Sequence, residues 1–122
     1  MSQFNADVLT DGAGLALYMF QPDHRQRATC TGSCAAIWPP VLLSPNQRAA
    51  AGTGVQPSLL GTDPYTGNRS VVTYNGWPLY TYISDTTAGS AVGQGLNLNG
   101  GYWYVIRPDG QPIVPAGDPP AT

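Results

Sequence analysis

The sequence predicts an all-β fold with little helix, built from two related antiparallel units. Turn formers are abundant, with 15 glycines and 12 prolines among 122 residues. The chain contains no lysine and no glutamate, which normally fill the exposed faces of helices. Short runs rich in β-branched and aromatic residues alternate with turn signals. We expect one domain, residues 1–122, in which the two units pack as a small sandwich or barrel.

The first unit begins with a predicted hairpin. Strands over residues 6–11 and 15–20 flank a Gly-Ala-Gly turn, and Gln21-Pro22-Asp23 ends the second strand. A polar segment follows, with one short helical turn expected over residues 34–37 before Trp38-Pro39-Pro40 stops it.

The middle of the chain is small and polar from Ser44 to Gly54, and we interpret it as a linker with a helical turn over residues 48–51. The runs 59–63 and 70–75 then predict a second hairpin around a turn at residues 64–68. A third strand over residues 78–83 extends this hairpin into a meander.

The last part of the chain contains a long glycine-rich loop over residues 85–101. A strand rich in aromatic and β-branched residues follows at 102–108. The tail, residues 110–122, has too many prolines to pair in the middle of a sheet.

An internal repeat relates the two halves. Residues 14–23 and 76–85 match in Gly, Leu, Tyr, an aromatic residue and Asp at equal offsets. The spacing from Tyr18 to Tyr80 equals that from Asp23 to Asp85. We therefore expect two repeats, about residues 6–43 and 58–109, related by a pseudo-twofold axis.

These motifs resemble a known family. The duplicated Tyr-x-aromatic-x-x-Asp pattern, the Cys-x-x-x-Cys before Ala-x-x-Trp-Pro-Pro, and the string Tyr-Asn-Gly-Trp-Pro-Leu-Tyr are similar to the bacterial "secreted repeat of unknown function" family. That family consists of predicted secreted proteins and lipoproteins, and the resemblance covers about residues 6–109. It implies an exported cell-envelope protein and brings no established activity.

Cys30 and Cys34 are close enough in the chain for one disulfide, which would fix a local turn. Free thiols are the alternative; a redox-active pair fits less well, because three residues separate the cysteines and no βαβ pattern surrounds them. A disulfide indicates an oxidising compartment, whether periplasm, cell surface or exterior. Residues 1–10 contain no recognisable export signal or lipidation cysteine.

Aromatic residues are the main candidates for a binding site. Alternation along a strand places Tyr18 and Phe20 on one face and Leu17 and Met19 on the other. If the leucines face the core, the tyrosines lie on an outer or inter-repeat surface where they can contact a ligand. We favour the alternative that the rings pack as cross-strand pairs. The candidate ligand-binding residues are Tyr18, Phe20, Asp23, Trp38, Trp77, Tyr80, Tyr82, Asp85 and Trp103.

Asp23 and Asp85 each follow a strand, where a carboxylate commonly caps a turn. As paired catalytic acids they would have to lie within about 5–10 Å of each other. His24, the only histidine, and Met19 could ligate haem or copper, although the chain has no Cys-x-x-Cys-His motif. It also has no Gly-x-Ser-x-Gly elbow, so we expect no enzyme activity.

Charge and hydropathy exclude two classes of partner. A net charge of −2 gives no electrostatic footprint for nucleic acid, and no segment approaches the roughly 20 apolar residues of a membrane span. An open strand edge would allow a homodimer. The sequence thus predicts a non-catalytic, exported module that binds an envelope protein or a small ligand. A haem- or copper-binding redox protein is the alternative.

Overall fold

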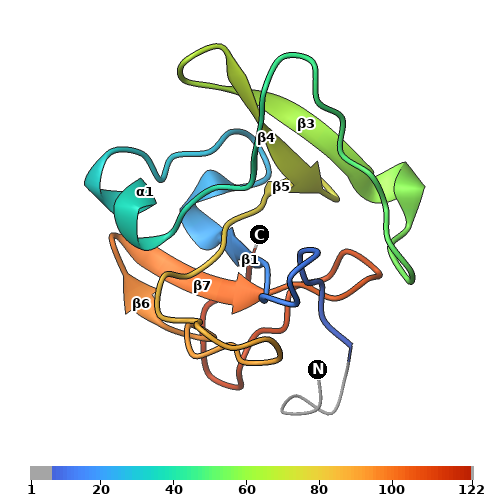
Figure 1. Cartoon of the computed structure of the whole chain (residues 1–122). Coiled ribbons are helices and arrows are strands. Elements are labelled where there is room, and N and C mark those ends of the chain that lie inside the picture. Colours follow the sequence, from blue (N-terminus) through green and yellow to red (C-terminus); the bar gives the residue numbers. More distant parts are fainter. Residues whose placement is uncertain (1–6, 122) are drawn as a thin grey trace.

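The computed structural model describes residues 7–121 and contains two antiparallel sheets (Figure 1). In the first sheet, β7 (Gly101–Val105) lies between β1 (Tyr18–Phe20) and β6 (Asn97–Leu98). In the second, β4 (Arg69–Tyr74) lies between β2 (Leu42–Leu43) and β3 (Leu60–Tyr65), and β5 (Trp77–Pro78) also pairs with β4. The predicted all-β class is confirmed, and the sheets do not close into a barrel.

Helix is scarce in residues 7–121. One short α-helix, α1 (Ser33–Ile37), forms where a helical turn was expected, and two 3-10 turns are present at η2 (Gln21–Asp23) and η3 (Pro57–Leu59). The helical turn expected over residues 48–51 is wrong, because that segment is irregular. A few alanines cannot offset the cost of nucleating a helix without packing contacts around it. No helix in the described part of the chain is long and apolar enough to cross a membrane.

The predicted hairpins are present with shifted ends. β3 and β4 form the second hairpin around a turn at residues 66–68. The first hairpin is reduced to one bridge between Thr10 and Ala16, supported by a 3.0 Å hydrogen bond from the Leu17 N–H to the Leu9 carbonyl. The strand expected at 78–83 is regular only at β5, after which Tyr80 makes isolated bridges.

β6 lies within the segment expected to be a long loop. It pairs with β7 through a tight turn at Asn99 and Gly100, which have φ angles of 56° and 96°. Asn-Gly is the strongest short hairpin signal in a sequence, because both residues tolerate positive φ. The expectation of an unpaired loop over residues 85–101 is therefore wrong at Asn97–Leu98, where this dipeptide turns the chain into a hairpin.

The two repeats are interleaved rather than placed side by side. Tyr18 of the first repeat pairs with Val105 of the second, and Tyr80 of the second repeat bridges Pro40 of the first. The second pairing is shorter because Pro39 and Pro40 have no N–H to donate. At the centre, the Tyr18 N–H donates to the Tyr80 carbonyl at 2.8 Å, and the Tyr80 N–H donates to the Tyr18 carbonyl at 3.0 Å. These reciprocal bonds place the pseudo-twofold axis between the two tyrosines.

Both faces of β1 are buried. Tyr18 and Phe20 belong to a first core cluster with Trp38, Tyr80 and Trp103. Leu17 and Met19 point the other way, into a second core cluster that contains the following residues: Leu9, Leu17, Met19, Val72, Tyr74, Trp77, Leu79, Tyr104, Ile106 and Ala121. The alternation of faces was therefore predicted correctly, and the tyrosine face lies between the repeats.

Candidate functional site

Each repeat donates a tyrosine hydroxyl to the aspartate of the other repeat. The Tyr18 hydroxyl donates to Asp85 Oδ2 at 2.6 Å, and the Tyr80 hydroxyl donates to Asp23 Oδ2 at 2.8 Å. Both aspartates are buried, with exposed fractions of 2% for Asp23 and 4% for Asp85. The tyrosine and the aspartate that recur at equal spacing in the two repeats thus form two equivalent bonds across the pseudo-twofold axis.

The second oxygen of each aspartate caps its own turn. Asp23 Oδ1 accepts the Thr29 N–H at 2.9 Å and the Thr29 hydroxyl at 2.6 Å. Asp85 Oδ1 accepts the Val92 N–H at 2.8 Å. Every carboxylate oxygen of this pair accepts at least one bond from the protein, as the turn-capping interpretation expects.

Burial shifts the pKa of Asp23 and of the two tyrosines. It raises the pKa of the Asp23 carboxyl, and the bonds from Thr29 and Tyr80 oppose that rise. Burial also raises the pKa of the Tyr18 and Tyr80 hydroxyls well above 10.0. Both tyrosines are consequently neutral donors throughout the physiological pH range.

Four aromatic rings stack across the interface between the repeats. Trp38 and Trp103 lie face to face, with ring centroids 3.9 Å apart and an interplanar angle of 2°. Phe20 stacks on the outer face of Trp103 at 4.1 Å, and Tyr82 stacks on Trp38 at 4.0 Å. The geometry is that of core packing between the repeats. A ligand contact by these rings stays a prediction.

The remaining candidates lie apart from this stack. Trp77 is buried in the second core cluster, and so is Met19. His24 is exposed in a left-handed turn with φ of 51°. Within residues 7–121, no group of three or more His, Cys, Asp or Glu side chains is arranged to hold a metal ion. Haem or copper ligation through His24 and Met19 would thus have to join an exposed and a buried side chain.

Cys30 and Cys34 form the expected disulfide, with their Cα atoms 5.2 Å apart. Cys30 is buried in the first core cluster, next to the aromatic stack. The disulfide therefore ties α1, which contains Cys34, to the buried Cys30 and leaves no thiolate at this position for a metal.

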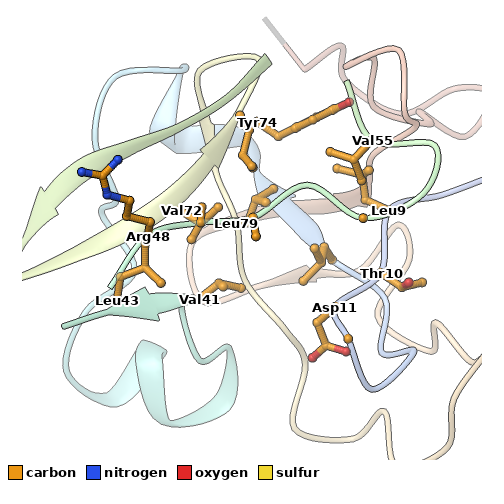
Figure 2. A pocket seen from close by; sticks show the side chains of 16 residues that line it. Leu9, Thr10, Asp11, Val41, Leu43, Arg48, Val55, Val72, Tyr74 and Leu79 are labelled. Atoms are coloured by element: carbon orange, nitrogen blue, oxygen red, sulfur yellow. The ribbon is translucent and has the colours of Figure 1, made fainter. Parts of the chain in front are cut away.

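A pocket of about 360 Å³ opens beside the second core cluster, and the sequence analysis missed it. Apolar side chains from the first hairpin and from the second sheet converge on it, and the segment 48–55 crosses its open side (Figure 2). Its lining residues include Leu9, Leu17, Val41, Leu43, Val55, Leu60, Val72, Tyr74 and Leu79. The covering loop was interpreted as a linker because alanine and glycine give no binding signal in a sequence.

Two charged residues line this pocket. Figure 2 shows Arg48 beside Leu43 on one side and Asp11 on another. The Asp11 carboxylate accepts the backbone N–H groups of Ala13 and Leu15 at 2.9 and 3.0 Å. The Tyr74 hydroxyl is also engaged, since it donates to the Pro108 carbonyl at 2.5 Å and accepts the Gln56 N–H at 2.9 Å.

The interleaved duplication and the internal disulfide define the class of this protein as an all-β internal-repeat protein with a disulfide inside its first repeat. The chain belongs to the family described as "Secreted repeat of unknown function", whose model matches residues 6–42 and 68–107. The two matches support the internal repeat, and they lie within the expected repeats of about residues 6–43 and 58–109. No curated protein and no solved structure matches the chain.

Proposed function

We propose that this protein is an exported, non-catalytic binding module of the cell envelope, and that the pocket beside the second core cluster is its ligand site. The observation that carries the proposal is the pocket itself. A concave, mostly apolar site of about 360 Å³ lies within the size range of small-molecule sites in proteins.

The buried carboxylates support a role without catalysis. Asp23 and Asp85 are each bound to a tyrosine of the other repeat and to a turn of their own. A general acid or base needs access to a substrate proton, whereas these groups are almost fully buried. Their arrangement fits a structural role at the interface between the repeats.

The description of the family and the Cys30–Cys34 disulfide support the proposed location outside the cytoplasm. The family is described as secreted, and the Cys30–Cys34 disulfide is stable where thiols are oxidised. We place the protein in the periplasm, at the cell surface or outside the cell. Whether it also binds an envelope protein or a second copy of itself stays a prediction.

Titration with 1-decanol, followed by the amide resonances of the ¹⁵N-labelled protein, tests the proposal. We expect saturable shifts at Leu9, Val72 and Leu79, which line the pocket. Ala49→Phe should abolish them, because Ala49 is half-buried against the second core cluster and a larger side chain would fill the pocket.

Ala51→Phe is the matched control, since Ala51 is exposed in the same loop and does not line this pocket. It should leave the decanol shifts intact. Shifts that do not saturate, or that Ala49→Phe leaves unchanged while its spectrum stays folded, would refute the assignment of the pocket.

A further inference from the structure

We infer that the ligand of the pocket is a single-chain amphiphile with a carboxylate headgroup, held at Arg48. This inference rests on the proposed function and specifies the chemistry of the same site. It joins three observations: the apolar lining, the unpaired guanidinium at its rim, and a second hollow beyond that rim.

The apolar lining fits an alkyl chain. Apart from Arg48, Thr10, Asp11 and Tyr74, the side chains that line the pocket are aliphatic or absent. A volume of about 360 Å³ lies at the small end of the range for ligand sites, so the pocket suits one short chain rather than a two-chain lipid. Burial of each methylene contributes about 0.8 kcal/mol, which makes a chain of this kind the natural occupant.

The charge at the rim selects the headgroup. Among residues 7–121, the one ion pair joins Arg107 to Asp109, so Arg48 has no carboxylate partner there. The only acidic side chain of the lining is Asp11, whose Oδ1 accepts two backbone N–H groups of its own turn. Because Asp11 lies on another side of the pocket, an anionic headgroup can pair with the Arg48 guanidinium without lying against that carboxylate.

Space for the headgroup lies next to Arg48. This arginine, with Ala49 and Leu60, also lines a second and more polar hollow of about 450 Å³. Gln47, Gly61 and Thr62 contribute to that hollow, which is wider open to solvent. A chain lying in the first pocket can thus present its carboxylate at Arg48 while the headgroup remains hydrated.

The loop over the pocket, residues 48–51, offers an entry path for an alkyl chain. Its two ends are fixed by turns, in which Gln47 N–H donates to the Ser44 carbonyl at 3.0 Å and Val55 N–H donates to the Gly52 carbonyl at 3.2 Å. Between them, no backbone hydrogen bond joins residues 48–51 to any other described residue. Few bonds must therefore break for a chain to enter.

Isothermal titration of the full chain with decanoate, 1-decanol and decyltrimethylammonium, each below its critical micelle concentration, tests the inference. We expect decanoate to bind about fivefold more tightly than 1-decanol at low salt, as an exposed ion pair of about 1 kcal/mol would give. Added NaCl should reduce this preference.

Arg48→Ala should abolish the preference for decanoate and leave the affinity for 1-decanol unchanged. Arg27→Ala is the matched control, because Arg27 is exposed and lines neither hollow. It should behave like the wild type.

The outcomes separate the two proposals. Equal binding of decanoate and 1-decanol, or an unchanged preference in Arg48→Ala, overturns the inference and leaves the proposed function standing. Tightest binding of decyltrimethylammonium also overturns it, because the cation would indicate Asp11 instead. Failure of all three probes to bind refutes the proposed function and, with it, the inference.

Discussion

The Tyr18 hydroxyl joins the two repeats by donating a hydrogen bond of 2.6 Å to Asp85 and accepting the Gly93 N–H at 3.1 Å. Tyr80 and Asp23 repeat the tyrosine–aspartate bond on the other side of the pseudo-twofold axis. Both bonds are buried, so each connects distant parts of the chain in a region from which water is excluded.

Tyr18→Phe should destabilise the protein by about 2–3 kcal/mol, because it leaves Asp85 Oδ2 and the Gly93 N–H without their buried partner. Tyr102→Phe is the control, since the Tyr102 hydroxyl makes no hydrogen bond to any described residue and the side chain is half-buried. Urea denaturation followed by tryptophan fluorescence measures both changes. Equal stabilities of the two variants would contradict the role given to Tyr18.

Asp23 should make the protein more stable in acid. Burial raises its folded pKa above the ordinary value of 3.8, so the folded state binds the proton more tightly than the unfolded chain. That stabilisation is fully present below pH 3.8 and is lost as the pH rises through the folded pKa. The free energy of unfolding of Asp23→Asn, measured from pH 3 to 8, should lack this decline when compared with the wild type. Parallel curves for the two proteins would show that Asp23 does not titrate in this way.

Loss of the disulfide should cost about 2 kcal/mol, as expected for closing so short a loop. The double variant Cys30→Ala, Cys34→Ala should lose this amount in guanidinium denaturation. Wild-type protein treated with a phosphine reductant should fall to a similar stability, and the double variant should not respond to the reductant. A wild type that is insensitive to full reduction would contradict this prediction.

Gly93→Ala should destabilise the protein by about 1–3 kcal/mol through overpacking. A Cβ at this position would lie 2.7 Å from Trp38 and 2.9 Å from Tyr82, against the rigid aromatic stack. Gly12→Ala is the matched control, because nothing lies within 4 Å of the added carbon and its φ is not positive. Thermal unfolding should separate the two variants by several degrees, and coincident transitions would argue against a tightly packed stack.

The strands and the repeat could be read from the sequence because their signals are local. The β-branched and aromatic residues at 70–75 correctly predict the strand β4. Tyr18 and Tyr80, which occupy the same position of the two repeats, pair with each other in the structure. Asp23 and Asp85 were correctly expected to cap turns. Their tyrosine partners could not be predicted, because which repeat supplies the hydroxyl depends on how the two halves interleave.

The pocket lay beyond prediction for a related reason. Leu9, Leu17, Val72 and Leu79 have the pattern of ordinary core residues, and all four pack in the second core cluster. A hollow arises because the segment from Ala49 to Gly52 supplies only small side chains above them. Whether small residues leave space or merely form a loop is decided by the path of the backbone, which no local pattern specifies.

The exchange of hydrogen-bond and strand partners between the repeats affects how the two repeats remain associated. In each repeat, the tyrosine donates its hydrogen bond to an aspartate of the other repeat. The strand β1 of the first repeat likewise pairs with β7 of the second. The two repeats of one chain thus contact each other as the subunits of a symmetric dimer do across an isologous interface. Because both repeats lie in one chain, their association is intramolecular and does not depend on protein concentration. At any dilution of the protein, the two repeats of one chain therefore remain at the same high effective concentration.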